Sequence, residues 1–143
     1  MISSPIHPKC VPSFRRRRRD RSGIAAVEFA VCLPVIVLLV FGAIEASSFI
    51  FLKQSLNVAC YEGVREAAKS GGTDADAETR AQAILNSRGV NDFEIRFPEG
   101  VDALSRGDQV VCEVSASART NSPLAGEFIE DRTLTARVVM LKE

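Results

Sequence analysis

Histidine, the side chain that enzymes use most often for proton transfer near neutral pH, occurs once in this chain. That residue, His7, lies among the first 23 residues. If those residues are removed, no imidazole remains for a Ser–His or Cys–His nucleophile pair or for binding a transition metal. The sequence also lacks a phosphate-binding loop and a nucleophile elbow. We therefore expect no catalytic residues, no cofactor and no metal, and not an enzyme.

Three acidic residues lie close together at Asp74, Asp76 and Glu78. Such spacing occurs in calcium-binding loops, but the central glycine and the distal glutamate of an EF-hand are missing here. Thr73 is a good helix N-cap, and acids in the first turn interact favourably with the helix dipole. The pattern therefore predicts the start of a helix and not a calcium site.

The charges are divided unevenly along the chain. Residues 1–23 hold seven of the 18 Lys and Arg residues and one of the 18 acids, a net charge of +6, which leaves −6 on the remainder. The remainder lacks the clustered Lys and Arg that phosphate contacts require, so we expect no nucleic-acid partner. The basic stretch is better explained as the flank of a membrane segment.

An apolar segment follows at residues 24–44, with Glu28 as its one charged residue. As a helix, it extends about 31 Å and matches a hydrocarbon core of about 30 Å. A secretory signal peptide would have a shorter apolar core and a small-residue cleavage site after it. We assign residues 1–23 to a basic leader and residues 24–52 to a transmembrane helix.

The orientation follows from the positive residues on either side. Six arginines lie within the ten residues before the segment, and only Lys53 lies close after it. The positive-inside rule then predicts a cytoplasmic N-terminus and an extracytoplasmic domain at residues 53–143.

Two residues inside the segment are unusual. Glu28 is ionisable, and acids in spanning segments are costly and often functional, although an interfacial acid reaching into the headgroups is the alternative. Pro34 has no amide proton and clashes with the carbonyl of Ala30, which predicts a kink or a loosened turn. Further along, Gly42 and Ala46 form a small-xxx-small pair that allows close approach of another helix, although such pairs also arise by chance.

The leader and the helix meet at residues 21–29, which read Arg-Ser-Gly-Ile-Ala-Ala-Val-Glu-Phe. This junction resembles the processing site of type IV prepilins. In that pattern a small residue, usually glycine, ends a basic leader, and Glu followed by Phe or Tyr occupies the fifth and sixth positions after the cut. Gly23 would end the leader here, and Glu28 and Phe29 fall at those two positions.

The wider stretch, about residues 20–70, resembles the TadE-like pseudopilins of the tight-adherence (Flp-type) pilus machinery. Three features carry this resemblance: a proline six residues after Glu28, the Gly-x-x-Glu at residues 42–45, and the run Glu-Gly-Val-Arg-Glu-Ala-Ala at residues 62–68. Nothing family-specific is recognised beyond residue 70.

The resemblance implies a minor pilin-like subunit in a bacterial inner membrane that assists assembly of the pilus or of a related secretion system. A prepilin peptidase would cut between Gly23 and Ile24, and the other partners would be pilins, pilus assembly proteins and membrane lipid. Glu28 would help subunit packing by meeting the free amine of a neighbour's Ile24, because an amine in an apolar setting needs a counter-charge. The other residues expected at subunit contacts are Phe29, Pro34, Gly42 and Ala46.

The alternative is a signal-anchored periplasmic binding or regulatory module that is never cleaved. In that case the Gly23–Ile24 bond stays intact, and the spacing to Glu28 and Phe29 arises by chance.

For residues 53–143 we predict a small α+β domain. The first helix continues beyond the membrane, because small and apolar residues recur at helical spacing as far as Ala67, and Gly71-Gly72 ends it. A second helix is expected at residues 74–88, ended by Gly89. Alternation with period two predicts three antiparallel strands around residues 93–97, 110–115 and 133–140, with loops at 98–108 and 119–131.

Of the four cysteines, Cys10 lies in the leader and Cys32 within the membrane segment. Only Cys60 and Cys112 would face an oxidising compartment, which makes them a disulfide candidate. Such a bond would tie the long helix to the middle strand and stabilise the domain by roughly 2–4 kcal/mol. Two buried free thiols are the alternative, because the sequence does not fix the distance between them.

Overall fold

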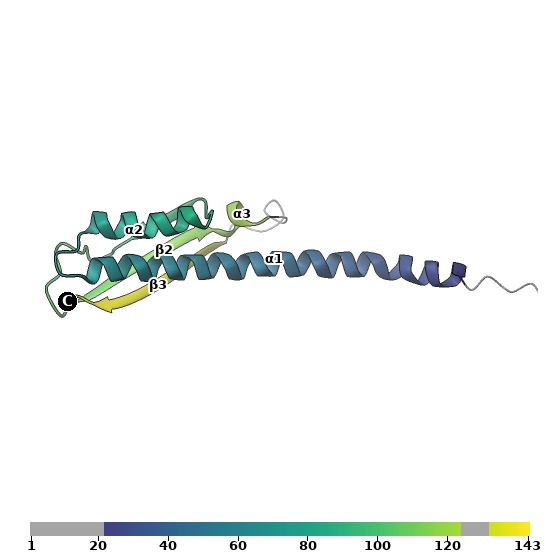
Figure 1. Ribbon diagram of the computed structural model, residues 1–143, viewed down its shortest axis with the longest axis horizontal. Coiled ribbons are helices and arrows are strands. Elements are labelled where there is room, and N and C mark those ends of the chain that lie inside the picture. The colour runs from purple at the N-terminus through teal and green to yellow at the C-terminus, as the bar shows by residue number, and fades with distance from the viewer. Residues whose placement is uncertain (1–21, 124–131) are drawn as a thin grey trace, which may run out of the picture. The chain divides into compact units, whose positions relative to one another are not determined.

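The computed structural model describes residues 22–123 and 132–143 (Figure 1). The elements of this part of the chain are α1 (Ser22–Ala68), α2 (Asp74–Ser87), β1 (Phe93–Arg96), β2 (Gln109–Ser117), α3 (Ala118–Asn121) and β3 (Thr133–Leu141). The predicted α+β class is confirmed, with a long N-terminal helix, a short second helix and a three-stranded antiparallel sheet. The chain divides into two compact units, Met1–Ile36 and Val37–Glu143.

The described part of the first unit is the beginning of α1. Every side chain from Gly23 to Ile36 is exposed, including large apolar residues such as Ile24, Val27 and Phe29. Pro34 lies inside α1, and the helix is assigned through it. The His7, Cys10 and arginine residues of the predicted leader lie outside the described residues.

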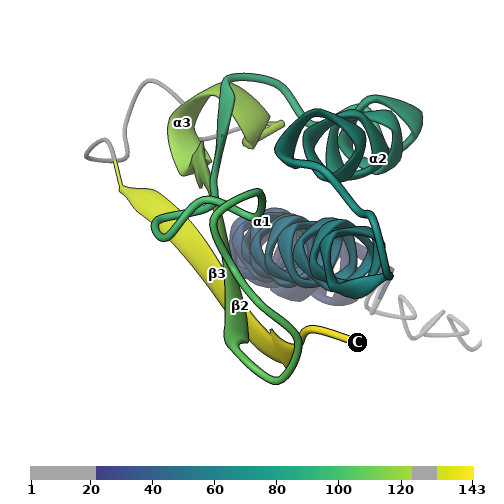
Figure 2. The ribbon, with the colours of Figure 1, turned by 90° about the vertical axis from the view of Figure 1, so that its left-hand side faces the viewer.

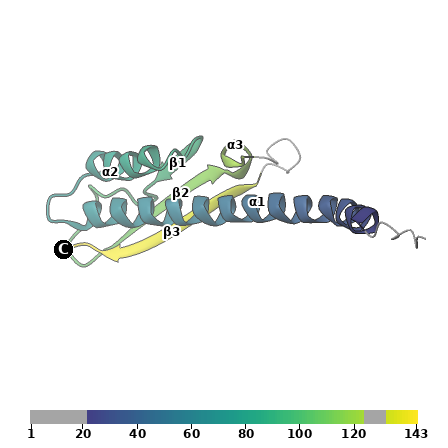
Figure 3. The ribbon, with the colours of Figure 1, turned by 45° about the vertical axis from the view of Figure 1, so that its right-hand side comes forward.

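In the second unit, α1 and α2 lie side by side on one face of the sheet, as the view along α1 in Figure 2 shows, and α2 contacts β1. The strand order is β1-β2-β3, with β2 in the centre. The register places Val114 of β2 opposite Ile95 of β1 and opposite Ala136 of β3. In Figure 3, β3 follows α1 along the outer part of this helix.

The outer part of α1 buries one face because its small and apolar residues recur every three or four positions. Leu56, Ala59, Cys60 and Val64 are fully buried there, as the helical spacing predicts. Burying a leucine such as Leu56 contributes about 1.5–3 kcal/mol to the stability of the domain. The core then continues into α2 and the sheet through Ala77, Ala81, Leu85, Val110, Cys112, Val114, Ala116 and Ala136.

Small residues let α1 and α2 approach each other closely. Gly63 is buried, and a Cβ atom added there would lie 3.1 Å from the Cβ of Ala81 and 3.4 Å from the carbonyl oxygen of Ala77. Since real Cβ contacts are seldom this short, the glycine sets the spacing between the two helices.

Local signals in the sequence fix the helix ends. α1 ends at Ala68, and Gly71 follows with a φ of 79°, a backbone conformation that glycine adopts readily. Thr73 is the N-cap of α2, where its side chain accepts a hydrogen bond of 3.2 Å from the Asp76 amide. Gly89, with a φ of 66°, follows the end of α2. These positions agree with the predicted helix boundaries to within three residues.

One short element differs from the prediction. Residues 119–131 were expected to form a loop, but Ala118–Asn121 forms α3. The Asn121 side chain donates 2.8 Å hydrogen bonds to the carbonyls of Ser117 and Asn91, and its oxygen accepts one of 2.8 Å from the Asn91 amide. Because Asn91 is 30 residues away in the sequence, no local pattern could predict this helix.

Candidate functional site

The predicted processing junction lies in the first turn of α1. The helix begins at Ser22, so Gly23 and Ile24 occupy positions whose amide groups lack the usual carbonyl partner four residues earlier. A Cβ atom added to Gly23 would meet nothing within 4 Å, and the Ile24 side chain is 62% exposed. The bond between Gly23 and Ile24 is therefore exposed in the single chain, at the start of α1.

Glu28 lies four residues after Ile24, so the two side chains share one face of α1. Its carboxylate is exposed and has no hydrogen-bond or ion-pair partner among the residues that the structure describes. With α1 starting at Ser22, Glu28 belongs to the second turn. Removal of the residues up to Gly23 would place it near a new helix start, where the dipole and a free α-amine both favour negative charge.

The other residues expected at subunit contacts are also open in the single chain. Phe29 is 61% exposed, Pro34 and Ala46 are exposed, and a Cβ atom added to Gly42 would meet nothing within 4 Å. The structure holds one chain, so contacts between subunits remain a prediction for these residues.

A second acid of α1, Glu45, joins the membrane helix to the outer domain. The Ser122 hydroxyl, 77 residues away in the sequence, donates a hydrogen bond to Glu45 Oε1. The other carboxylate oxygen, Oε2, is buried and has no hydrogen-bond partner within residues 22–123 and 132–143. In the sequence, Glu45 is notable only as part of the Gly-x-x-Glu pattern. Its contact with Ser122 could not be predicted there, because it depends on the position of α3.

Cys60 of α1 and Cys112 of β2 lie together in the core, and both are fully buried. The Cys60 thiol donates a hydrogen bond of 2.9 Å to the Cys112 carbonyl. Both are thiols in this structure, so the disulfide stays a prediction. The hydrogen bond between the two thiols lowers the pKa of Cys60 and raises the pKa of Cys112, and burial raises the pKa of Cys112 further.

The acids near the start of α2 have structural partners. Asp74 accepts a hydrogen bond of 2.9 Å from the Val101 amide, and Asp76 accepts one of 2.7 Å from the Thr73 hydroxyl. Within the described part of the chain, no group of three or more His, Cys, Asp or Glu side chains could hold a metal ion.

One described helix, Gly23–Ala68, is long and apolar enough to cross a membrane by length and composition, and the mean hydropathy of its apolar window is 2.8. That window has no residue buried inside the structure, unlike the core helix of a soluble protein. The helix therefore fits a single-pass membrane anchor.

Comparison with known proteins gives one match. The model of a family described as TadE-like protein matches residues 23–65, from the predicted processing glycine to Arg65. No curated protein and no solved structure matches the chain. The family match suggests involvement in a tight-adherence pilus and association with its assembly components. Residues 23–65, which form nearly all of α1, are thus similar to the TadE-like family, in agreement with the resemblance of the sequence motifs.

Proposed function

We propose that this chain is a minor pilin-like subunit that assists assembly of a tight-adherence pilus or a related secretion system. The observation that carries this proposal is the family match over residues 23–65, which begins at Gly23 and includes Ile24, Glu28 and Phe29. The role is structural, not catalytic. Its partners are other pilins or pseudopilins and the pilus assembly proteins.

The proposed location is a bacterial inner membrane, with a cytoplasmic N-terminus and residues 53–143 in the periplasm. The six arginines before the apolar segment support this orientation, because positive residues near a membrane helix stay on the cytoplasmic side. The apolar window of α1 supports a single crossing.

A prepilin peptidase would cut the bond between Gly23 and Ile24. The cut would leave the new α-amine of Ile24 one turn from Glu28, in an apolar helix start with no basic side chain nearby in the sequence. Each amine would then need a carboxylate, on the same chain or on a neighbour, which gives Glu28 a role in subunit packing.

Intact mass spectrometry of the membrane-embedded protein tests this proposal, in cells with and without the prepilin peptidase. We expect a mature chain beginning at Ile24 only where the peptidase is present. Gly23→Leu should block the cut, because a side chain there obstructs the approach of the protease to the backbone. Gly42→Leu is the matched control, since it adds the same side chain to α1 at an open position away from the junction.

If residues 1–23 remain attached in both kinds of cell, the pseudopilin mechanism is wrong. The alternative function, an uncleaved signal-anchored binding or regulatory module, would then apply. One observation favours that alternative: residues 66–143, which include α2 and the whole sheet, lie outside the family match.

A further inference from the structure

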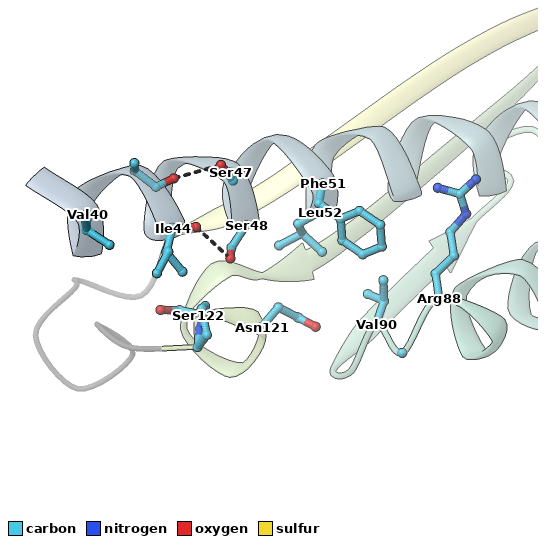
Figure 4. Close-up of a pocket in the computed structure, with 13 residues that line it drawn as sticks. Val40, Ile44, Ser47, Ser48, Phe51, Leu52, Arg88, Val90, Asn121 and Ser122 are labelled. Atoms are coloured by element: carbon cyan, nitrogen blue, oxygen red, sulfur yellow. Dashed lines mark hydrogen bonds between the residues drawn. The ribbon is translucent and has the colours of Figure 1, made fainter.

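A groove of about 670 Å³ lies in the second unit, between α1 and the loops that follow α2 and α3 (Figure 4). Its α1 wall extends from Val40 to Leu52, and Arg88 and Val90 form part of the opposite wall. In Figure 4, Val40 and Ile44 lie at one end and Arg88 lies at the other. The volume is in the range of about 300–1,000 Å³ that is typical of sites for small organic ligands.

The wall of this groove is apolar despite its several hydroxyl and amide groups. Ser47 and Ser48 turn their hydroxyls back to the carbonyls of Ala43 and Ile44, at 2.8 and 3.1 Å. The Asn121 amide is bonded to backbone groups of Ser117 and Asn91. Because these polar groups are already hydrogen-bonded within the protein, the groove offers a ligand mainly apolar surface. Val40, Ile44 and Phe51 are among the residues that form this surface.

Among the described residues, Arg88 is the one charged residue that lines the groove. Its side chain has no ion pair and no hydrogen bond to another described residue, and the residue is partly buried. A guanidinium always carries its charge in a protein, and it binds phosphate through paired hydrogen bonds. The end of the groove at Arg88 therefore favours an anion, and the end at Val40 favours a hydrocarbon.

The groove also lies at the right depth for a membrane ligand. If residues 24–44 span the hydrocarbon core, Val40 lies about 6 Å inside that core and Leu52 about 12 Å beyond its edge. The headgroup layer of a bilayer extends about 5–8 Å on each side of the core. The groove thus extends from the hydrocarbon core past the headgroup layer, so a lipid bound in it would be drawn partly out of the bilayer, with its phosphate towards the Leu52 end.

We propose that this groove binds an anionic glycerophospholipid of the outer leaflet, with its phosphate at Arg88 and an acyl chain along Val40 and Ile44. A free phosphate ion would leave the apolar wall unoccupied, and an apolar helix of a second copy would leave Arg88 without a counter-charge. The bound lipid fixes the outer domain at the membrane surface. This inference rests on the proposed membrane insertion of α1, and not on processing or pilus assembly.

Native mass spectrometry of the full chain, purified in mild detergent and titrated with phosphatidylglycerol or phosphatidylcholine, tests the proposal. We expect one phosphatidylglycerol molecule to stay bound in preference to phosphatidylcholine. Arg88→Gln should weaken this binding by about tenfold, because a hydrogen-bonded ion pair is lost. Arg80→Gln is the matched control, since Arg80 is paired with Glu62 at 2.9 Å and does not line the groove.

A second pair of variants tests the apolar end independently of Arg88. Ala43→Phe should fill the groove and displace the lipid, whereas Ala30→Phe adds the same side chain to α1 at an exposed position that does not line the groove. Equal binding by Arg88→Gln and Arg80→Gln, or by the two lipids, would overturn the proposal. A dimer that Ala43→Phe abolishes would also overturn it, because a second copy would then occupy the groove.

Whether the protein is recovered from cell membranes distinguishes a failure of this inference from a failure of the proposed function. An integral membrane protein that lacks the lipid preference contradicts the lipid site alone. Absence of the protein from the membrane fraction contradicts both the lipid site and the proposed location.

Discussion

At the scale of single residues, the proposed function makes its clearest prediction for Glu28. It is an exposed carboxylate in an otherwise apolar stretch, and no described side chain neutralises it. A charge in a membrane segment costs free energy on insertion, and such residues often mark functional sites. Glu28 lies one helical turn from Ile24, so its carboxylate would be close to the α-amine that processing would create at Ile24.

We therefore predict that Glu28→Gln leaves processing intact but lowers the incorporation of the protein into pilus assemblies by about tenfold or more. The reason is that removing one partner of a buried ion pair costs about 3–5 kcal/mol. Co-purification with other pilins measures the effect. Glu66→Gln is the control, because Glu66 is paired with Lys69 on the outer domain. Normal incorporation of Glu28→Gln would show that its charge has no role in packing.

Cys60 and Cys112 give a second prediction at this scale. In an oxidising compartment we expect them to form a disulfide that stabilises the domain by about 2–4 kcal/mol. Because a thiolate is the attacking species in disulfide formation, oxidation of the pair should become faster as the pH rises.

Thiol alkylation after denaturation, with and without prior reduction, measures this bond. Unreduced protein should label at Cys32 alone among the three cysteines of the mature chain, and Cys112→Ala should release Cys60 for labelling. Labelling of both Cys60 and Cys112 without reduction would mean that they remain buried thiols.

At the scale of elements, the domain depends on the close contact of α1 and α2. Gly63 permits this contact because a larger residue would meet Ala81 and the backbone at Ala77. On the other side of α1, the Lys53 ammonium donates to the Thr135 carbonyl of β3 and holds the strand against the helix. α1 thus packs against both α2 and β3 of the outer domain.

Gly63→Val should destabilise the outer domain by about 1–3 kcal/mol, because overpacking forces the two helices apart. Thermal unfolding of the detergent-solubilised protein, followed by circular dichroism, measures the loss. Gly42→Val is the matched control, since a Cβ atom there meets nothing within 4 Å. An unchanged midpoint for Gly63→Val would show that the helices can separate at little cost.

At the scale of the whole molecule, the proposed topology depends on the division of charge between residues 1–23 and the remainder. In this proposed topology, arginines before the apolar segment would hold the N-terminus in the cytoplasm, and the domain of residues 53–143 would cross the membrane. Replacing Arg15–Arg19 and Arg21 with glutamine should lower the fraction of chains with a periplasmic C-terminus. A C-terminal reporter active only in the periplasm measures that fraction, and replacing Lys53 together with Arg65 is the control.

The sequence by itself determined the elements whose signals are local. Hydrophobic spacing predicted the membrane helix and its extension, Thr73 and Gly89 predicted the limits of α2, and alternation with period two predicted the three strands. These signals suffice because helix and strand periodicity, capping and turns depend on residues within a few positions of one another. The motifs around Gly23 and Glu28 could likewise be identified from the sequence alone, because they lie in one continuous stretch of the chain that the family model matches.

Only the tertiary structure decided the features that join distant residues. α3 depends on Asn121 meeting Asn91, Glu45 meets Ser122, and Cys60 meets Cys112 across 52 residues. The groove beside Arg88 arises in the same way, from α1 and two loops that have no shared pattern in the sequence. Such contacts are set by how whole elements pack, because side chains far apart in the chain meet only after the core has fixed the positions of the helices and strands.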